Sequence, residues 1–212
     1  MLSDKIANNF LVERQIFQLV GNHPRIVRDI LVGTTYQETK TDYFLLSLAM
    51  AIFSATWTIN LRRFLLQCGV IHSDIRPENF LVHATSSTSL DLWLCDFGGS
   101  TCEELGLDGG HLPDSGFYDP KSQPESNPHT DIFSIGSVIY TIVTGHWPYR
   151  SSGPFRTGDE MEEYRQKVDH LFELGQFPDV NGLFAGKIMM KCWLNDYVSA
   201  DDLFREISLL ND

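Results

Sequence analysis

Residues 72–82 place a carboxylate and a carboxamide at a spacing that suits chemistry on phosphate. They spell His-Ser-Asp-Ile-Arg-Pro-Glu-Asn and an apolar run, so Asn79 follows Asp74 by five positions. Phosphoryl transfer needs a proton acceptor near the attacking hydroxyl and oxygen ligands for a magnesium ion. Asp74 could accept that proton, and Asn79 could offer a neutral oxygen to the metal. The alternative is an ordinary polar turn ahead of a strand.

A second carboxylate, Asp96, ends an apolar run and is followed by Phe-Gly-Gly, which lets the chain turn. Between the two stretches, residues 80–82 and 90–95 have strand-like composition, and a short polar loop joins them. We expect an antiparallel hairpin that brings Asp74, Asn79 and Asp96 to one edge. Oxygen-bearing side chains gathered in this way suit a hard cation that carries phosphate oxygens.

The two stretches together resemble the eukaryotic protein kinase family, in a serine/threonine-like, divergent fungal form. Residues 72–74 resemble the family's His-Arg-Asp loop, residues 76–79 its Lys-Pro-Glu-Asn, and residues 96–98 match its Asp-Phe-Gly. Further along the chain, residues 131–136 resemble the start of the central helix of the family's large lobe, and residues 191–193 a later helix. The resemblance covers nearly the whole chain.

The resemblance implies roles for seven residues, and it makes ATP and Mg²⁺ the expected cofactors. The implied catalytic residues are Asp74, Arg76 and Asn79, and the implied cofactor-binding residues are Glu13, Asp96, Phe97 and Gly98. Asp74 would be the base, Arg76 a phosphate contact, and Asn79 and Asp96 the metal ligands. The implied reaction moves the γ-phosphate of ATP to serine or threonine hydroxyls of a protein.

The sequence leaves open whether the chain is an enzyme. The family holds phosphates under a glycine-rich loop and pairs a strand lysine with the helix glutamate that Glu13 matches. Only 12 residues precede Glu13, Lys5 is the one lysine among them, and no glycine occurs before Gly21. The alternative function is therefore that of a pseudokinase-like protein-binding module with weak or no ATP binding.

Composition narrows the class of protein. The chain of 212 residues suits a single domain, and its net charge of −12 argues against a nucleic-acid partner, which needs a basic face. Four cysteines show neither metal-ligand spacing nor a disulfide framework, so a cytoplasmic, reduced protein is expected. Residues 43–61 form an uncharged run of 19 residues, which we interpret as a buried helix; it is the sole candidate for a membrane span.

The expected fold class is α+β, a kinase-like domain over 1–212 with residues 1–42 as a remnant of the small lobe and 43–212 as the large lobe. Helices are expected over residues 5–20, 43–67, 131–144, 160–174, 182–193 and 199–210, and strands over 26–32, 80–82 and 90–95.

Two further expectations concern the loops of this domain. Asp131 could cap its own helix, or it could hold the backbone of the catalytic loop as the family's equivalent acid does. Residues 99–120 should be a loop equivalent to the activation segment, with Ser100, Thr101 and Ser115 as candidate modification positions.

Overall fold

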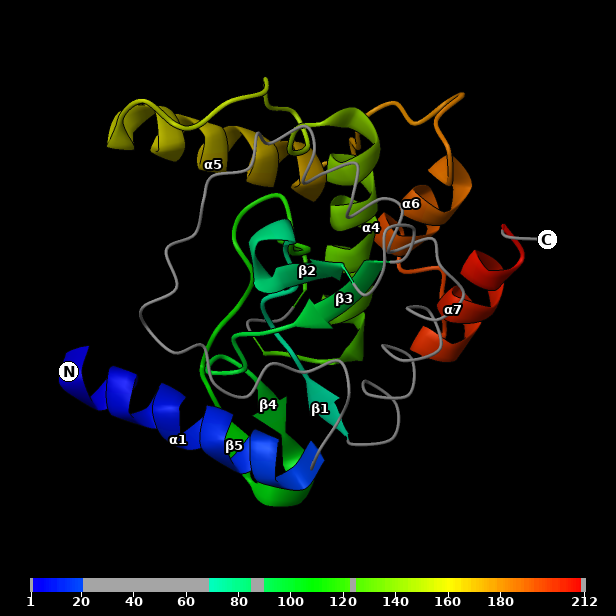
Figure 1. Cartoon of the computed structure of the whole chain (residues 1–212). Coiled ribbons are helices and arrows are strands. Elements are labelled where there is room, and N and C mark those ends of the chain that lie inside the picture. Colours follow the sequence, from blue (N-terminus) through cyan, green and yellow to red (C-terminus); the bar gives the residue numbers. More distant parts are fainter. Residues whose placement is uncertain (1, 21–68, 85–89, 123–124, 211–212) are drawn as a thin grey trace.

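The computed structural model describes residues 2–20, 69–84, 90–122 and 125–210, and within them a mainly helical body with two small sheets (Figure 1). The helices are α1 (Leu2–Val20), α4 (Pro128–Thr144), α5 (Gly158–Glu173), α6 (Gly186–Trp193) and α7 (Ala200–Ser208), with short 3₁₀ helices η1 (Pro77–Asn79) and η2 (Glu103–Leu105). The strands are β1 (Val70–Ile71), β2 (Phe80–Ala84), β3 (Leu90–Leu94), β4 (Thr101–Cys102) and β5 (Leu107–Asp108). The expected α+β class is confirmed.

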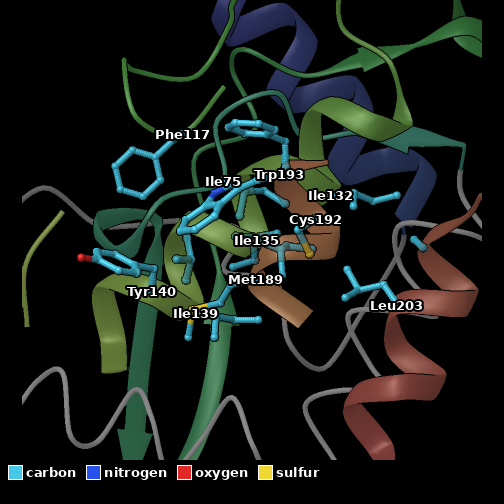
Figure 2. Packing of buried hydrophobic residues seen from close by; sticks show 14 of the residues in the cluster. Ile75, Phe117, Ile132, Ile135, Ile139, Tyr140, Met189, Cys192, Trp193 and Leu203 are labelled. Atoms are coloured by element: carbon cyan, nitrogen blue, oxygen red, sulfur yellow. The ribbon is translucent and has the colours of Figure 1, made fainter. Parts of the chain in front are cut away.

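Helix α4 runs through the centre of the core. Apolar side chains surround it, which is the pattern of a fully buried helix, and nearly all of its residues from Thr130 to Ile142 are buried. Figure 2 shows Ile135 and Ile139 of α4 meeting Met189 and Cys192 of α6, with Leu203 of α7 beyond them. Gly136 allows this contact, because a Cβ there would lie 2.6 Å from the Cβ of Cys192.

Asn127, and not Asp131, caps the N-terminus of α4. The Asn127 side chain accepts from the backbone N–H of His129, and the Thr130 hydroxyl accepts from the Asn127 N–H, which completes a reciprocal cap. The helix therefore begins three residues before the predicted start, and the capping role expected for Asp131 is wrong. The carboxylate of Asp131 is free to serve another element.

The peripheral helices follow the sequence with one shift. Thr157 caps α5 and Ser199 caps α7, the latter by accepting from the backbone N–H of Asp202, as the spacing predicted. Helix α6 starts at Gly186 instead of residue 182, because the chain before it turns tightly. A Cβ on Gly186 would lie 2.3 Å from the carbonyl oxygen of Val180.

The two sheets lie on either side of the loop that follows β1. Strands β2 and β3 pair antiparallel from Phe80–Leu94 to Ala84–Leu90, which confirms the predicted hairpin. The second sheet has the order β1-β4-β5, and α1 lies against it (Figure 1). Gly109 closes this sheet onto residues 98–100, since a Cβ there would lie 2.4 Å from the carbonyl carbon of Gly99.

Some expectations fall outside the described residues: the strand over 26–32 and the apolar helix over 43–67, with its possible membrane span. Within the part of the chain that the structure describes, no helix has the length and apolar character needed to cross a bilayer. The division of the domain at residue 42 stays a prediction.

Candidate functional site

The loop of residues 72–79 is fixed from behind by Asp131. One oxygen of its carboxylate accepts from the backbone N–H of His72 at 2.8 Å and the other from the N–H of Ser73 at 2.9 Å. These bonds hold Ser73 in the left-handed region at φ 65°, a conformation that a non-glycine residue adopts at a cost. Burial raises the pKa of Asp131 to about 7. The two N–H donors lower this pKa, and the nearby Asp74 carboxylate raises it further.

His72 lies fully buried in this loop and is held as a neutral ring. Its Nδ1 accepts from the backbone N–H of Asp74 at 3.3 Å, and its Nε2 donates to the carbonyl oxygen of Cys95 at 3.0 Å. A ring that accepts at one nitrogen and donates at the other is neutral. Burial lowers the pKa of His72, and the carboxylates of Asp74 and Asp96 offset that only in part.

Three rings in edge-to-face contact link this loop to α1. Phe97 is fully buried, with its ring centroid 4.7 Å from that of His72 and 5.8 Å from that of Phe17. Gly98 lets α1 come close, because a Cβ there would lie 3.1 Å from the Cβ of Asn9. Phe97 and Gly98 therefore act here as packing positions that fix where Asp96 stands.

Asp74 and Asn79 are brought into direct contact, as expected. The amide nitrogen of Asn79 donates to the backbone oxygen of Asp74 at 2.8 Å and to its carboxylate Oδ2 at 2.9 Å. Pro77 starts η1 and the ring-restricted backbone suits that tight turn. Because the side-chain nitrogen of Asn79 faces Asp74, the side-chain oxygen Oδ1 of Asn79 is the atom left to bind another group.

Asp96 reaches the same edge through the β2–β3 hairpin. Its neighbour Cys95 donates its backbone N–H to the backbone carbonyl oxygen of Asn79 at 3.0 Å. Asp96 therefore comes directly after a residue that is hydrogen-bonded to Asn79. Asp96 is exposed and has a left-handed backbone at φ 62°. Its carboxylate acts electrostatically on both His72 and Cys95, which places negative charge beside the loop.

Glu13 lies half-buried in α1 on the same side of the molecule. Burial raises the pKa of the Cys95 thiol to about 12, and the carboxylates of Asp96, Glu13 and Asp74 add to that rise. Glu13 is therefore close enough to the hairpin end to share its electrostatic field with the two aspartates.

Arg76 lies on the front of the loop, the side that also carries Asp74 Oδ1, and three carboxylates surround it. Its Nη1 bonds to Asp114, and its Nε lies 3.7 Å from Asp74 Oδ2 and 4.0 Å from Glu78. Asp114 also pairs with Arg165 of α5 at 3.7 Å. Asp114 was not predicted from the sequence, because it lies 38 residues from Arg76 and no spacing rule connects the two.

His111 is a second residue of the site that no sequence pattern predicted. Its Nε2 lies 3.7 Å from Asp74 Oδ1, the distance of an ion pair. Burial alone would raise the pKa of Asp74, but His111, Arg76 and Asn79 outweigh burial and lower it. Asp74 is therefore an ionised acceptor at neutral pH.

The segment 99–120 is not the continuous loop that the sequence predicted, because β4, η2 and β5 lie within it. The structure also corrects two expectations about serines as modification positions. Ser100 is 0% exposed and donates to the carbonyl oxygen of His72, so it is part of the core. Ser115 donates to the carboxylate of Asp169 at 2.8 Å, where an added phosphate would meet like charge. At the end of the segment, Asn195 donates to Asp119 at 3.0 Å and ties the segment to the turn after α6.

Comparison with known proteins agrees with this geometry. The protein kinase domain model matches residues 50–180, which is more than half of the chain. The kinase domain in a crystal structure of Rad53 with SCD2 superposes with a TM-score of 0.59 over 94% of this chain and 75% of that one, at 17% identity, which supports the fold.

Curated proteins similar to this chain include two named as serine/threonine-protein kinases and one named as a ribosomal protein S6 kinase. PknL of Mycobacterium tuberculosis is 25% identical over 134 residues, 61% of this chain and 33% of that protein. PKH3 of Eremothecium gossypii is 24% identical over 206 residues, 82% and 27%, and human ribosomal protein S6 kinase alpha-3 is 25% identical over 185 residues, 74% and 24%. The aligned region thus spans about a quarter to a third of each relative. With a family model over most of its length and a matching fold, the chain belongs to the protein kinase domain family.

Proposed function

We propose that this chain is a protein kinase-type phosphotransferase that moves the γ-phosphate of ATP to serine or threonine hydroxyls of a protein. The observation that carries the proposal is the state of Asp74. Its Oδ2 accepts from Asn79, its Oδ1 has no hydrogen-bond partner among the described residues, and its pKa is lowered. An ionised carboxylate with one oxygen left over is what an attacking hydroxyl requires of its proton acceptor.

The residues at the loop edge suit Mg²⁺ with ATP. The side-chain nitrogen of Asn79 is used by Asp74, which leaves its side-chain oxygen to bind a metal ion. Asp96 presents an exposed carboxylate from a strained turn. Neutral and anionic oxygens of this kind are the ligands that Mg²⁺ prefers. Bound there, the ion would neutralise charge on the phosphates of ATP.

The other implied residues lie around Asp74, Asn79 and Asp96 and support the site through packing and charge. Phe97 and Gly98 fix the turn of Asp96 through their packing on His72 and α1. Glu13 lies near Cys95, one residue from Asp96. Arg76 stands beside Asp74 and would contact the transferred phosphate once it exchanges Asp114 for that anion, since a guanidinium binds either group through the same N–H donors.

One observation favours the second candidate, a kinase-like module that binds a protein partner without transferring phosphate. The positive and negative groups at the front of the loop are already paired with side chains of the segment 99–120, Arg76 with Asp114 and Asp74 with His111. A site whose own segment satisfies its charges has less need of a nucleotide.

Transfer of labelled phosphate separates the two functions. With γ-labelled ATP, Mg²⁺ and a generic serine- and threonine-containing protein, the phosphotransferase labels the protein and Asp74→Asn reduces the rate by roughly a hundredfold or more. Asp159→Asn is the matched control, because Asp159 is an exposed acid in the first turn of α5. No labelling by wild type, together with retained binding of a protein partner, would favour the binding module.

A further inference from the structure

The two carboxylate oxygens of Asp74 have different surroundings. Oδ2 accepts from Asn79 at 2.9 Å and lies 3.7 Å from Arg76 Nε. Oδ1 has no hydrogen bond among the described residues and faces His111 Nε2 at 3.7 Å. Because Asn79 already uses Oδ2, Oδ1 is the oxygen through which Asp74 would accept a substrate hydroxyl. His111 stands at that oxygen.

The backbone around His111 places its ring at Asp74 in a defined way. Gly99 lies under the side chain, and a Cβ on it would approach the Cβ of His111 to 2.7 Å, so only glycine leaves the space that His111 occupies. The carbonyl oxygen of His111 accepts from the Ser126 hydroxyl at 3.1 Å. The backbone position of His111 is therefore set by the path of the segment 99–120, whose far end is anchored just before α4, while its ring meets Asp74 through the ion pair.

Charges from three sides act on the His111 ring. Asp74 of the catalytic loop raises the pKa of His111 most, and Asp114 of its own segment adds to this rise. Burial and Lys5 of α1 act in the opposite direction. His72 lies behind Asp74 and is neutral, so it brings no competing charge. The balance favours the protonated ring beside an ionised Asp74.

We propose that His111 is a pH-dependent cap on Asp74. The protonated ring occupies the approach to Oδ1 and excludes a substrate hydroxyl, whereas the neutral ring gives up the ion pair and lets the hydroxyl in. The pairing itself stands on the geometry of Asp74, His111 and Gly99, and its regulatory use rests on the phosphotransferase function proposed above.

The cap predicts a specific effect on kinetics. One pH unit below the titration midpoint of His111, about a tenth of the molecules carry the neutral ring, so the apparent affinity for protein substrate is reduced about tenfold. His111→Ala should therefore raise kcat/KM for the protein substrate about tenfold at that pH and leave it nearly unchanged well above the midpoint. The KM for ATP should not change, because the oxygen that His111 faces, Asp74 Oδ1, is assigned to the protein substrate and not to the nucleotide.

The test begins with NMR titration of the histidine rings in the intact chain labelled with ¹⁵N, which needs no enzymatic activity. We expect His111 to titrate at a higher pH in the folded chain than in the same chain unfolded in urea, and to lose that difference in Asp74→Asn. His111 titrating at the same pH in the folded and the unfolded wild-type chain, or unaffected by Asp74→Asn, would overturn the cap even if the enzyme transfers phosphate.

The second measurement is the pH profile of kcat/KM in wild type, His111→Ala and the control His129→Ala. An acidic limb present in wild type and in His129→Ala, and lost in His111→Ala, supports the cap; identical profiles in all three overturn it. If none of the three transfers phosphate at any pH while the NMR titration is as expected, the phosphotransferase function has failed, and the cap fails with it because there is no reaction to regulate.

Discussion

The loop of residues 72–79 has two faces that differ in how completely their polar groups are satisfied. Behind the loop, both oxygens of Asp131 and both ring nitrogens of His72 have hydrogen-bond partners within 3.3 Å. In front of it, Asp74 Oδ1 and Arg76 Nε have none among the described residues and meet their neighbours only at ion-pair distances of 3.7 Å or more.

This difference separates what holds the loop from what the loop presents. Buried polar groups are normally satisfied, since each one left without a partner costs about 1–3 kcal/mol. The back of the loop follows that rule and fixes the backbone. The front departs from it at the carboxylate and guanidinium that would face a ligand, so the front is expected to exchange partners and the back is not.

The largest expected effect comes from removing the edge-to-face ring contacts behind the loop. Phe97→Ala removes a fully buried ring between Phe17 and His72 and should lower the free energy of unfolding by about 3–5 kcal/mol. Urea denaturation followed by circular dichroism measures the loss. Phe10→Ala on the outer face of α1, where Phe10 is 68% exposed, is the control and should change it by less than about 0.5 kcal/mol. Equal losses of unfolding free energy in the two variants would show that these ring contacts do not hold the loop.

A smaller but clear loss should follow from Asp131→Asn. The amide has one acceptor oxygen, so one of the N–H groups of His72 and Ser73 is left facing an N–H₂ group, at a cost of about 1–3 kcal/mol. The same denaturation experiment checks it, with the exposed Asp159→Asn as control. A variant as stable as wild type would mean that the carboxylate does not anchor the loop.

Asp114→Asn at the front should change stability by less than about 1 kcal/mol, because partly exposed ion pairs contribute little. It should, however, weaken the hold on Arg76 and change the rate of phosphate transfer. Denaturation and labelled-ATP assays measure the two effects separately. A stability loss as large as that of Asp131→Asn would contradict the distinction between the two faces.

The smallest effect is on the pH dependence of stability, where the two histidines have opposite signs. The folded pKa of His72 is lowered, so its contribution falls as pH drops below the unfolded value of 6.5. The folded pKa of His111 is raised, so its contribution is present below 6.5 and is lost as pH rises through the folded pKa. Removing His111 in His111→Ala should therefore make stability fall more steeply on acidification. Melting temperatures between pH 5 and 8 test this, and a shallower slope in the variant would reverse the assignment.

The sequence predicted the contacts within the loop and hairpin better than those that reach the loop from residues 99–120, for a physical reason. Asp74, Asn79 and Asp96 lie within one loop and hairpin, so local spacing and strand pairing bring them together. The sequence left two roles open for Asp131, a cap of its own helix or an anchor of the catalytic loop. Which role applies depends on Asn127, which completes the cap of α4 in its place.

The contacts that the sequence did not reveal depend on the course of an irregular segment. His111 and Asp114 reach the loop from 37 and 38 positions beyond Asp74 and Arg76, through turns at glycines that carry no periodic signal. The start of α6 at Gly186 was missed because the close approach of the Val180 carbonyl oxygen is a tertiary contact.

Binding of Mg²⁺-ATP shows whether the front of the loop receives the ligand that its oxygens suit. At ATP ten times above its Kd, binding adds about 1.4 kcal/mol to stability and should raise the melting temperature by about 3–5 °C. Asp96→Ala should remove that rise, while Asp159→Asn keeps it. No shift in wild type at millimolar Mg²⁺-ATP, or an equal shift in Asp96→Ala, would contradict the account.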